Sequence, residues 1–277
     1  MACPTFRLIG VNMAENDKQS RGTALVTGAS SGIGLELARV LSEHRFDLVV
    51  TARSEDRLRA LADEIVSTQR VSVRVVAADL ARPDGAEVVA RAVAGGIDVL
   101  VNNAGFGTHG PFAETPVVEE LAELQVNVVA LTHLTKLLLP AMRARGSGRI
   151  LNVASTAAFV PGPFMAVYYA TKAYVLSFSV ALAEELAGTG VSVTALCPGP
   201  THTRFQDRAG LERTRLFRSG NVMGAREVAE AGYAGLMAGQ TVVVPGWRNR
   251  LLASSSALAP RRLTAKIARA FNDAPAK

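Results

Sequence analysis

The run T-A-L-V-T-G-A-S-S-G-I-G, residues 23–34, predicts a short β-strand that ends in a glycine turn and leads into a helix. Its glycines follow G-x-x-x-G-x-G, not the G-x-G-x-x-G of other dinucleotide-binding folds. Small residues there let the backbone approach a pyrophosphate, and the helix N-terminus offers free N–H groups and partial positive charge. A tight turn that merely packs a helix on a strand is the alternative. The glycines together with Thr27, Ser30 and Ser31 favour the phosphate site.

The alternation of strand and helix continues along most of the chain. Strand cores are rich in β-branched residues, and helical spacing follows them. This pattern predicts an α/β protein with a doubly wound parallel sheet. Strands are expected at 23–28, 46–52, 71–78, 97–101, 148–154, 191–196 and 241–245, and helices at 54–69, 83–94 and 115–143, with another that carries residues 168–172 and extends to about 186.

The length of 277 residues fits one large α/β domain better than two independent ones. We expect a flexible leader over residues 1–21, in which Met13 offers a second start, the main domain over 22–247, and a basic tail over 248–277. Hydrophobic residues make up 49% of the chain and charged residues 19%, which provides for a core and argues against disorder.

The formal net charge of +6 is concentrated in the tail. From Arg248 to the C-terminus there are seven basic residues and one acid, which leaves 23 basic and 23 acidic residues in the rest. A DNA-binding protein would carry a basic face on its folded body, so no nucleic-acid partner is expected. Cys3 and Cys197 are far apart and outside any ligand-spaced cluster, and no signal sequence or uninterrupted apolar run of membrane-spanning length is found. We therefore expect a reduced, cytoplasmic protein without a metal site.

Residues 155–172 carry a hydroxyl, a phenol and an amine at informative spacing. Ser155 lies at the end of a predicted strand, where open α/β sheets bind ligands. Tyr168 and Lys172 are four residues apart, which places them on one face of a helix. A nearby cation favours phenolate, so we expect Lys172 to lower the pKa of Tyr168 and make it a general acid or base. A chance pair on a solvated helix face is the alternative.

The end of the second strand suggests which dinucleotide binds. An acid there would hold both ribose hydroxyls and select NAD, whereas Ala52 is followed by Arg53 and Ser54, which suit a 2′-phosphate and NADP. Arg53 as an ordinary loop charge is the alternative, and Glu55 lies close by. Asp79 and Leu80 end the third strand, placed to flank an adenine.

Two amide features stand out among apolar neighbours. Asn102 and Asn103 follow a strand, where such amides either join neighbouring strands or line a ligand cleft. Asn127 lies within a predicted helix, and a buried amide there needs a partner or a function. A satisfied structural amide is the simpler interpretation for Asn127.

Taken together, these motifs resemble those of the short-chain dehydrogenase/reductase family and cover roughly residues 22–205. The matching segments are T-G-A-S-S-G-I-G at 27–34, Asp79, N-N-A-G at 102–105, Asn127, Ser155, Y-Y-A-T-K at 168–172 and P-G-P-T at 198–201. The resemblance implies a single-domain Rossmann fold with a seven-stranded parallel sheet and a bound dinucleotide. It also implies an oxidoreductase that forms a homodimer or homotetramer.

The resemblance further implies a catalytic tetrad of Asn127, Ser155, Tyr168 and Lys172. Ser155 would bind the substrate oxygen, Tyr168 would transfer its proton, Lys172 would bind the nicotinamide ribose, and Asn127 would hold a water that links Lys172 to solvent. Tyr169 is the rival phenol, about 100° round the helix. The expected cofactor-binding residues are Gly28, Ser30, Ser31, Gly32, Ile33, Gly34, Arg53, Ser54, Asp79, Leu80, Asn103, Ala104, Gly105, Tyr168, Lys172, Pro198, Gly199 and Thr201.

Three segments, 106–112, 159–165 and 201–222, are expected to ring the substrate pocket. The first two are rich in Phe, Pro, Gly and Met, which favours an apolar ketone or acyl chain over a sugar. The third is rich in arginine and would act as a solvated lid or steer an acidic carrier such as acyl carrier protein.

The tail places Leu263, Ile267 and Phe271 at i, i+4 and i+8 among basic residues. Such a helix either covers its own domain or a partner subunit, which we favour, or lies on anionic lipid.

The predicted function is an NADP(H)-preferring oxidoreductase that interconverts a secondary alcohol and a ketone on an apolar substrate. A 3-oxoacyl thioester reductase acting on acyl carrier protein or coenzyme A substrates is the alternative within the class. A non-catalytic NADP-binding sensor or scaffold is the alternative from another class.

Overall fold

The computed structural model describes residues 8–9, 20–203, 222–256 and 259–273, and its main sheet has eight strands. The order is β1-β4-β3-β2-β5-β6-β7-β10, in which β1 pairs antiparallel with β4 and the other neighbours pair in parallel. The strands are β1 (Leu8–Ile9), β2 (Thr23–Thr27), β3 (Asp47–Ala52), β4 (Val73–Ala77), β5 (Val99–Asn102), β6 (Gly148–Val153), β7 (Val191–Leu196) and β10 (Val242–Val243). A separate parallel pair consists of β8 (Thr201–His202) and β9 (Met223–Gly224).

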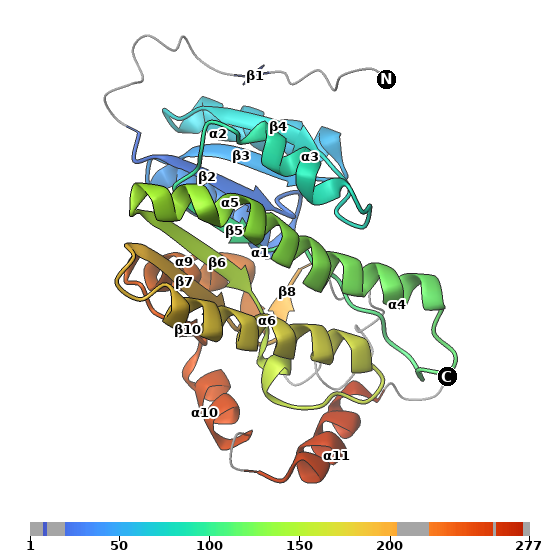
Figure 1. Ribbon diagram of the computed structural model, residues 1–277. Coiled ribbons are helices and arrows are strands. Elements are labelled where there is room, and N and C mark those ends of the chain that lie inside the picture. The colour runs from blue at the N-terminus through green and yellow to red at the C-terminus, as the bar shows by residue number, and fades with distance from the viewer. Residues whose placement is uncertain (1–7, 10–19, 204–221, 257–258, 274–277) are drawn as a thin grey trace.

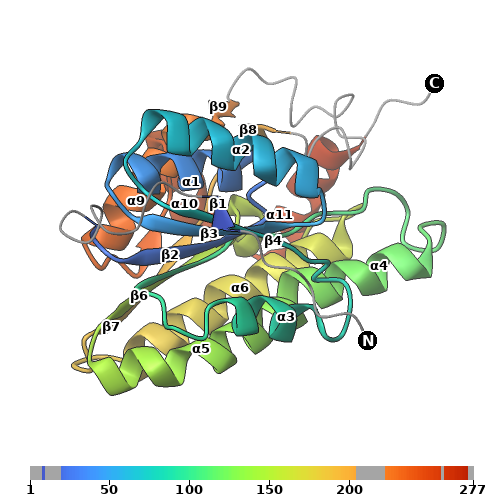
Figure 2. The same cartoon turned by 90° about the horizontal axis from the view of Figure 1, so that it is seen from above.

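Helices cover both faces of this sheet (Figures 1 and 2). They are α1 (Gly32–Glu43), α2 (Glu55–Thr68), α3 (Gly85–Ala92), α4 (Val117–Leu124), α5 (Leu131–Arg145), α6 (Ala166–Glu185), α9 (Ala225–Met237), α10 (Trp247–Ser256) and α11 (Arg261–Asn272). Because strand side chains alternate between faces, Ala24 and Val26 of β2 join the core under α1, α2 and α9. Leu25 joins the opposite core, which the side chains of α3, α5 and α6 complete.

The predicted fold class is confirmed. All seven predicted parallel strands are present, each within about two residues of its expected limits. The edge strand β1, the pair β8–β9 and helices α9 and α10 were not anticipated from the sequence. Cys3 and the arginine-rich segment 204–221 lie outside the described residues, so the lid hypothesis stays a prediction.

The helix predicted over 115–143 has the expected length but is shifted by two residues and is less regular than expected. It runs from Val117 to Arg145, and a π-helical turn, Gln125–Ala130, separates α4 from α5. By length and composition, this helix and α6 would both be able to cross a membrane, a property that helices packed on a soluble core share. In the described structure both pack alongside the sheet (Figure 2).

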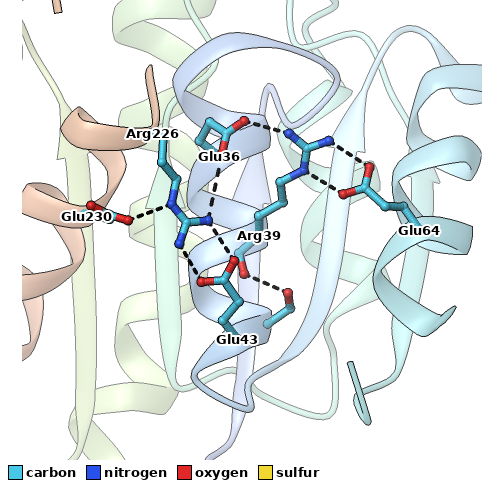
Figure 3. Close-up of polar contacts among 7 residues, drawn as sticks. Glu36, Arg39, Glu43, Glu64, Arg226 and Glu230 are labelled. Atoms are coloured by element: carbon cyan, nitrogen blue, oxygen red, sulfur yellow. Dashed lines mark hydrogen bonds and ion pairs between the residues drawn. The ribbon is translucent and has the colours of Figure 1, made fainter. Parts of the chain in front are cut away.

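A network of ion pairs holds the helices of one face together (Figure 3). Arg226 at the start of α9 bonds both oxygens of Glu43 on α1, at 2.7 and 2.6 Å, and bonds Glu230 at 2.7 Å. Arg39 of α1 joins Glu64 of α2 through two bonds of 2.8 and 2.7 Å. The network thereby connects the neighbouring helices α1 and α2 with α9, which is distant from both in sequence.

Candidate active site

A cavity of about 1100 Å³ opens at the carboxyl ends of the strands. Its position is the one that the topology favours, since β2 lies between β3 and β5 and the strand order reverses there. A typical small-molecule pocket has roughly 300–1,000 Å³, so this cavity has room for a dinucleotide and a substrate together. Among the residues expected to bind cofactor, those lining it are Gly28, Ser30, Ser31, Gly32, Ile33, Arg53, Ser54, Asp79, Leu80, Asn103, Ala104, Gly105, Tyr168, Lys172, Pro198, Gly199 and Thr201.

The glycine turn forms one wall of the cavity. Gly28 has a φ of +68° and Gly32 a φ of +59°, a region that side-chain-bearing residues rarely adopt. A Cβ at Gly28 would lie 2.8 Å from Asn103 Nδ2, so the turn has no room for a side chain. Ser31 makes no side-chain cap on α1, which leaves the first N–H groups of that helix available to an anion. The turn therefore fits a pyrophosphate.

Gly34 lies behind this wall and not in it. A Cβ there would collide with the Asn103 side chain and the Gly28 carbonyl. Its role in the structure is close packing of α1 against the turn, which differs from the direct contact implied for it by the family resemblance.

Of the two roles that the sequence left open for Asn102 and Asn103, Asn102 joins neighbouring elements and Asn103 lines the cavity. Asn102 Nδ2 donates to Asn152 Oδ1 at 2.9 Å and Thr135 Oγ1 at 3.0 Å, which joins β5, β6 and α5. Asn103 Nδ2 donates to the Thr27 carbonyl at 2.9 Å, and Asn103 lines the cavity. One amide thus connects elements, and the other holds the glycine turn in place.

Ser155, Tyr168 and Lys172 converge on the far wall. Ser155 follows β6, and its hydroxyl accepts from Ala157 N at 3.1 Å and is hydrogen-bonded to the Tyr168 hydroxyl. Lys172 Nζ lies 5.7 Å from the centre of the Tyr168 ring and donates to the Val153 carbonyl at 2.8 Å. A phenol, a hydroxyl and an ammonium group therefore meet in one cavity, an arrangement suited to proton transfer at a carbonyl or alcohol oxygen.

Asn127 lies behind this group and does not line the cavity. It is buried in the π-helical turn, a local geometry that recurs at functional sites. Its Nδ2 donates to the Phe106 carbonyl at 2.9 Å and to Thr171 Oγ1 at 3.1 Å, and its Oδ1 accepts from Phe106 N at 3.1 Å. A Cβ at Gly105 would lie 3.0 Å from Asn127 Oδ1 and 3.5 Å from Lys172 Nζ, so the amide and the amine approach each other across Gly105.

A family model described as short chain dehydrogenase matches residues 22–213, more than half of the chain. The chain belongs to the short-chain dehydrogenase family.

Two of the similar proteins are named as reductases of ketoacyl compounds. The chain is 36% identical to the ketoacyl reductase HetN of Nostoc sp., over 64% of this chain and 62% of that protein. It is 34% identical to the human very-long-chain 3-oxoacyl-CoA reductase, over 63% of this chain and 58% of that protein, so it spans less than two thirds of either relative. A short-chain dehydrogenase from Sphingobium yanoikuyae in complex with NADPH superposes with a TM-score of 0.78, at 34% identity over 85% of this chain and 93% of that one.

The protonation states differ from the sequence expectation for this short-chain dehydrogenase. Enclosure in the cavity wall raises the pKa of Tyr168 above its ordinary value, and the Ser155 hydrogen bond only partly opposes this. Burial lowers the pKa of Lys172 to about 8. The expected lowering of the Tyr168 pKa by Lys172 is therefore wrong, because desolvation of the phenolate dominates.

Arg53 and Arg57 line the cavity where the adenosine ribose of a dinucleotide is expected. Both are exposed, and neither has an ion-pair partner among the described residues. Glu55 is occupied by Arg59, whose Nη2 lies 2.6 Å from Glu55 Oε1. The sequence analysis did not single out Arg57, although its position in the first turn of the helix that follows Arg53 was a usable signal.

Tyr169, the rival phenol, has a structural partner. Its hydroxyl donates to Asn272 Oδ1 of α11 at 3.1 Å, and its ring meets the Tyr168 ring edge-on with centroids 6.1 Å apart. Tyr169 therefore attaches the tail to the cavity wall, whereas Tyr168 has its hydroxyl on Ser155.

Glu123 is a buried carboxylate that the sequence analysis missed. It is 0% exposed, Oε2 accepts from Thr108 N at 2.9 Å, and Oε1 has no hydrogen-bond partner in the described structure. Burial raises the pKa of Glu123 to about 7, and attraction to Lys172 opposes this rise. Its position four residues before Asn127, on the same helical face, was the available signal.

Proposed function

We propose that this protein is an NADP(H)-preferring oxidoreductase that interconverts a secondary alcohol and a ketone on an apolar substrate. The observation that carries the proposal is the hydrogen-bonded pair of Tyr168 and Ser155 beside Lys172, inside a cavity large enough for a dinucleotide and a substrate.

The roles follow from the positions of these side chains. Ser155 and Tyr168 present two hydroxyl groups to one substrate oxygen, so Ser155 orients it and Tyr168 exchanges its proton. Because the phenol is neutral near pH 7, Tyr168 begins in the form that donates a proton to a developing alkoxide. Lys172 below pH 8 is cationic and stabilises negative charge on the Tyr168 oxygen after that donation. A nicotinamide cofactor, when bound, supplies or accepts the hydride.

The preference for NADP rests on charge. A 2′-phosphate carries about two negative charges, which suits the guanidinium groups of Arg53 and Arg57, since neither has an ion-pair partner in the part of the chain that the structure describes. Glu55, the nearby acid that would favour ribose hydroxyls, is engaged by Arg59 at 2.6 Å.

The apolar substrate class is inferred from the lining of the inner cavity. Phe106, Val126, Ala157, Met165 and Tyr169 line the side near Tyr168. A sugar would leave its hydroxyls without partners against these side chains, at a cost of roughly 1–3 kcal/mol for each unpaired group.

A 3-oxoacyl thioester is the second candidate substrate, and the relatives favour it. HetN is named a ketoacyl reductase and the human relative a very-long-chain 3-oxoacyl-CoA reductase. The apolar lining of the cavity suits an acyl chain as well as a bulky ketone.

We further propose that the protein forms a homo-oligomer through its α4–α6 side. Several large apolar side chains there are exposed, including Val118 at 70%, Leu121 at 60% and Val180 at 42%.

We also propose that the protein is located in the cytoplasm. Cys197 is buried and free, in keeping with that reducing compartment.

One experiment tests the proposed function. NADPH consumption is measured spectrophotometrically across small ketones, steroids and 3-oxoacyl thioesters, and NADPH binding is measured separately by fluorescence. We expect consumption with at least one apolar carbonyl compound and a preference within the panel that separates the two substrate candidates. Binding of NADPH without consumption across the whole panel would instead support the non-catalytic sensor.

A further inference from the structure

Helix α11 packs on the protein with the opposite face from the one that its sequence suggests. Its large apolar residues are exposed: Leu263 at 51%, Ile267 at 50% and Phe271 at 42%. The buried positions are Thr264, Ala268 and Asn272, which are small or polar. The expectation that the apolar face covers its own domain is therefore wrong, and about half of each large side chain is left for another partner.

Helix α10 shows the same inversion. Trp247 is 68% exposed, Leu251 63% and Leu252 64%, whereas Asn249 and Ala253 are buried. Both helices lie beyond the β10 edge of the sheet, at the bottom of Figure 1. We call these two helices, α10 and α11, the tail surface.

The charge on the tail surface is of one sign. Neither helix contains an acidic residue, and the basic residues on them are exposed and without ion-pair partners among the described residues: Arg248, Arg250, Arg261, Arg262, Lys266 and Arg269. Long basic side chains extend beyond apolar neighbours and place their charges at phosphate level, and tryptophan favours the same interface. Large apolar side chains among unopposed basic ones are the pattern of helices that lie on anionic lipid.

We propose that the tail surface docks on an anionic phospholipid bilayer. The same surface is poorly suited to a symmetric contact between two copies, because six basic residues of one copy would face six of the other. An anionic bilayer suits both the charge and the apolar residues of the tail surface. Its headgroups neutralise the basic side chains, and its acyl region accepts the apolar ones.

The tail surface is also attached to the rim of the cavity. Asn272 Nδ2 donates to the Pro163 carbonyl at 3.0 Å, Tyr169 donates to Asn272 Oδ1 at 3.1 Å, and His109 Nε2 lies 2.7 Å from the Asn272 carbonyl oxygen. The Arg269 guanidinium lies 5.2 Å from the centre of the Phe164 ring. Docking would bring these rim segments to the bilayer, which, if the proposed function holds, lets an apolar substrate enter from the lipid.

The test is vesicle flotation of the full chain with phosphatidylcholine vesicles, with and without phosphatidylglycerol, at about 0.05 M and about 0.5 M NaCl. We expect binding to the anionic vesicles at low salt, weakened by at least about tenfold at high salt and on removal of phosphatidylglycerol. The double variant Arg262→Glu/Lys266→Glu is expected to lose binding, and Leu251→Ser/Leu252→Ser to weaken it at both salt concentrations. The matched control Arg70→Glu/Lys136→Glu, which reverses two exposed charges elsewhere, is expected to bind like the wild type.

Failure of this proposal is separable from failure of the proposed function. NADPH consumption with a water-soluble ketone is measured in the same preparations, where the tail variants are expected to match the wild type. Reduction of the ketone without binding to anionic vesicles would overturn the lipid proposal alone. Equal loss of binding in the control variant would also overturn it. Conversion of an oligomer to monomer by the tail variants, together with absent vesicle binding, would assign the tail surface to a second copy.

Discussion

Arg53 decides the cofactor preference if its guanidinium group contacts the 2′-phosphate. A charge-assisted hydrogen bond contributes roughly 1.5–3 kcal/mol, so Arg53→Ala is expected to weaken NADPH binding by about 10- to 100-fold and leave NADH binding nearly unchanged. Fluorescence titration with each cofactor measures this. Arg70→Ala, at an exposed arginine outside the cavity lining, serves as control. If Arg53→Ala weakened the binding of NADPH and NADH equally, Arg53 would attract both dinucleotides by its charge and would not select the 2′-phosphate.

The buried Glu123 carboxyl group is expected to lower the stability of the folded protein as the pH rises. Its pKa rises from 4.5 in the unfolded chain to about 7 in the folded protein, so the folded state binds more protons between these values. Stability is expected to be highest below the lower value, to fall across this window by at most on the order of 3 kcal/mol, and to level off above it.

The variant Glu123→Gln is expected to flatten this dependence, because the amide keeps the acceptor for Thr108 N but does not titrate. Urea unfolding at about pH 5 and about pH 8 measures the effect. Glu119→Gln, which changes an exposed carboxylate on the same helix, is expected to retain the wild-type slope. A wild-type slope in Glu123→Gln would show that the buried carboxylate titrates as it does in water.

At the residue scale, the sequence predicted where the site residues lie better than it predicted their pKa values and burial. The sequence correctly predicted that Ser155, Tyr168 and Lys172 lie together in one cavity. This was possible because the spacing of residues on a helix and the ligand-binding edge of a parallel sheet follow from local sequence pattern. The pKa of Tyr168 was predicted in the wrong direction, because it depends on how much water the folded protein excludes from the phenol. Burial of Glu123 was missed for the same reason.

Among elements, the ion-pair network of Figure 3 links α9 to α1 through Arg226 and α1 to α2 through Arg39. Exposed pairs contribute roughly 0.2–1 kcal/mol each, so Arg226→Met is expected to destabilise the protein by about 1–2 kcal/mol, because Glu43 and Glu230 lose their partner. The loss is expected to shrink in high salt. Urea unfolding compares it with Arg91→Met, which breaks only a 3.5 Å pair with Glu87. A loss no larger than that of Arg91→Met would show that the network adds nothing beyond isolated pairs.

Helical periodicity predicted a helix where α11 lies but not which face it buries. A pattern of apolar and basic residues defines two faces, and only the neighbours decide which one packs inward. In this helix Asn272 makes the anchoring contacts to Tyr169 and Pro163, and these turn Leu263 and Ile267 toward solvent. The two-residue strand β1 carried too little pattern to be recognised.

For the whole molecule, the alternation of strands and helices was sufficient to predict the parallel sheet and its two helical layers, since crossover connections leave few other arrangements. The oligomeric state depends on surfaces that the local sequence pattern does not define.

Val118→Glu and Leu121→Glu on α4 are each expected to convert the proposed oligomer to monomer, because burial of a carboxylate in an apolar contact is costly.

Size-exclusion chromatography with light scattering measures that change. Leu252→Glu on α10, at a residue of similar exposure, is expected to leave the oligomer intact. A monomeric wild type, or an oligomer that both α4 variants leave unchanged, would place the subunit contact elsewhere or remove it.

Single-turnover NADPH oxidation with a ketone that the wild type reduces tests the central assignment most directly. Tyr168→Phe is expected to slow hydride transfer by about 10²- to 10⁴-fold while NADPH still binds, because the variant lacks the proton that the substrate oxygen requires. Tyr174→Phe, at a phenol on the same helix that bonds Thr132 at 2.9 Å, is expected to react at the wild-type rate. Wild-type turnover by Tyr168→Phe would contradict the account.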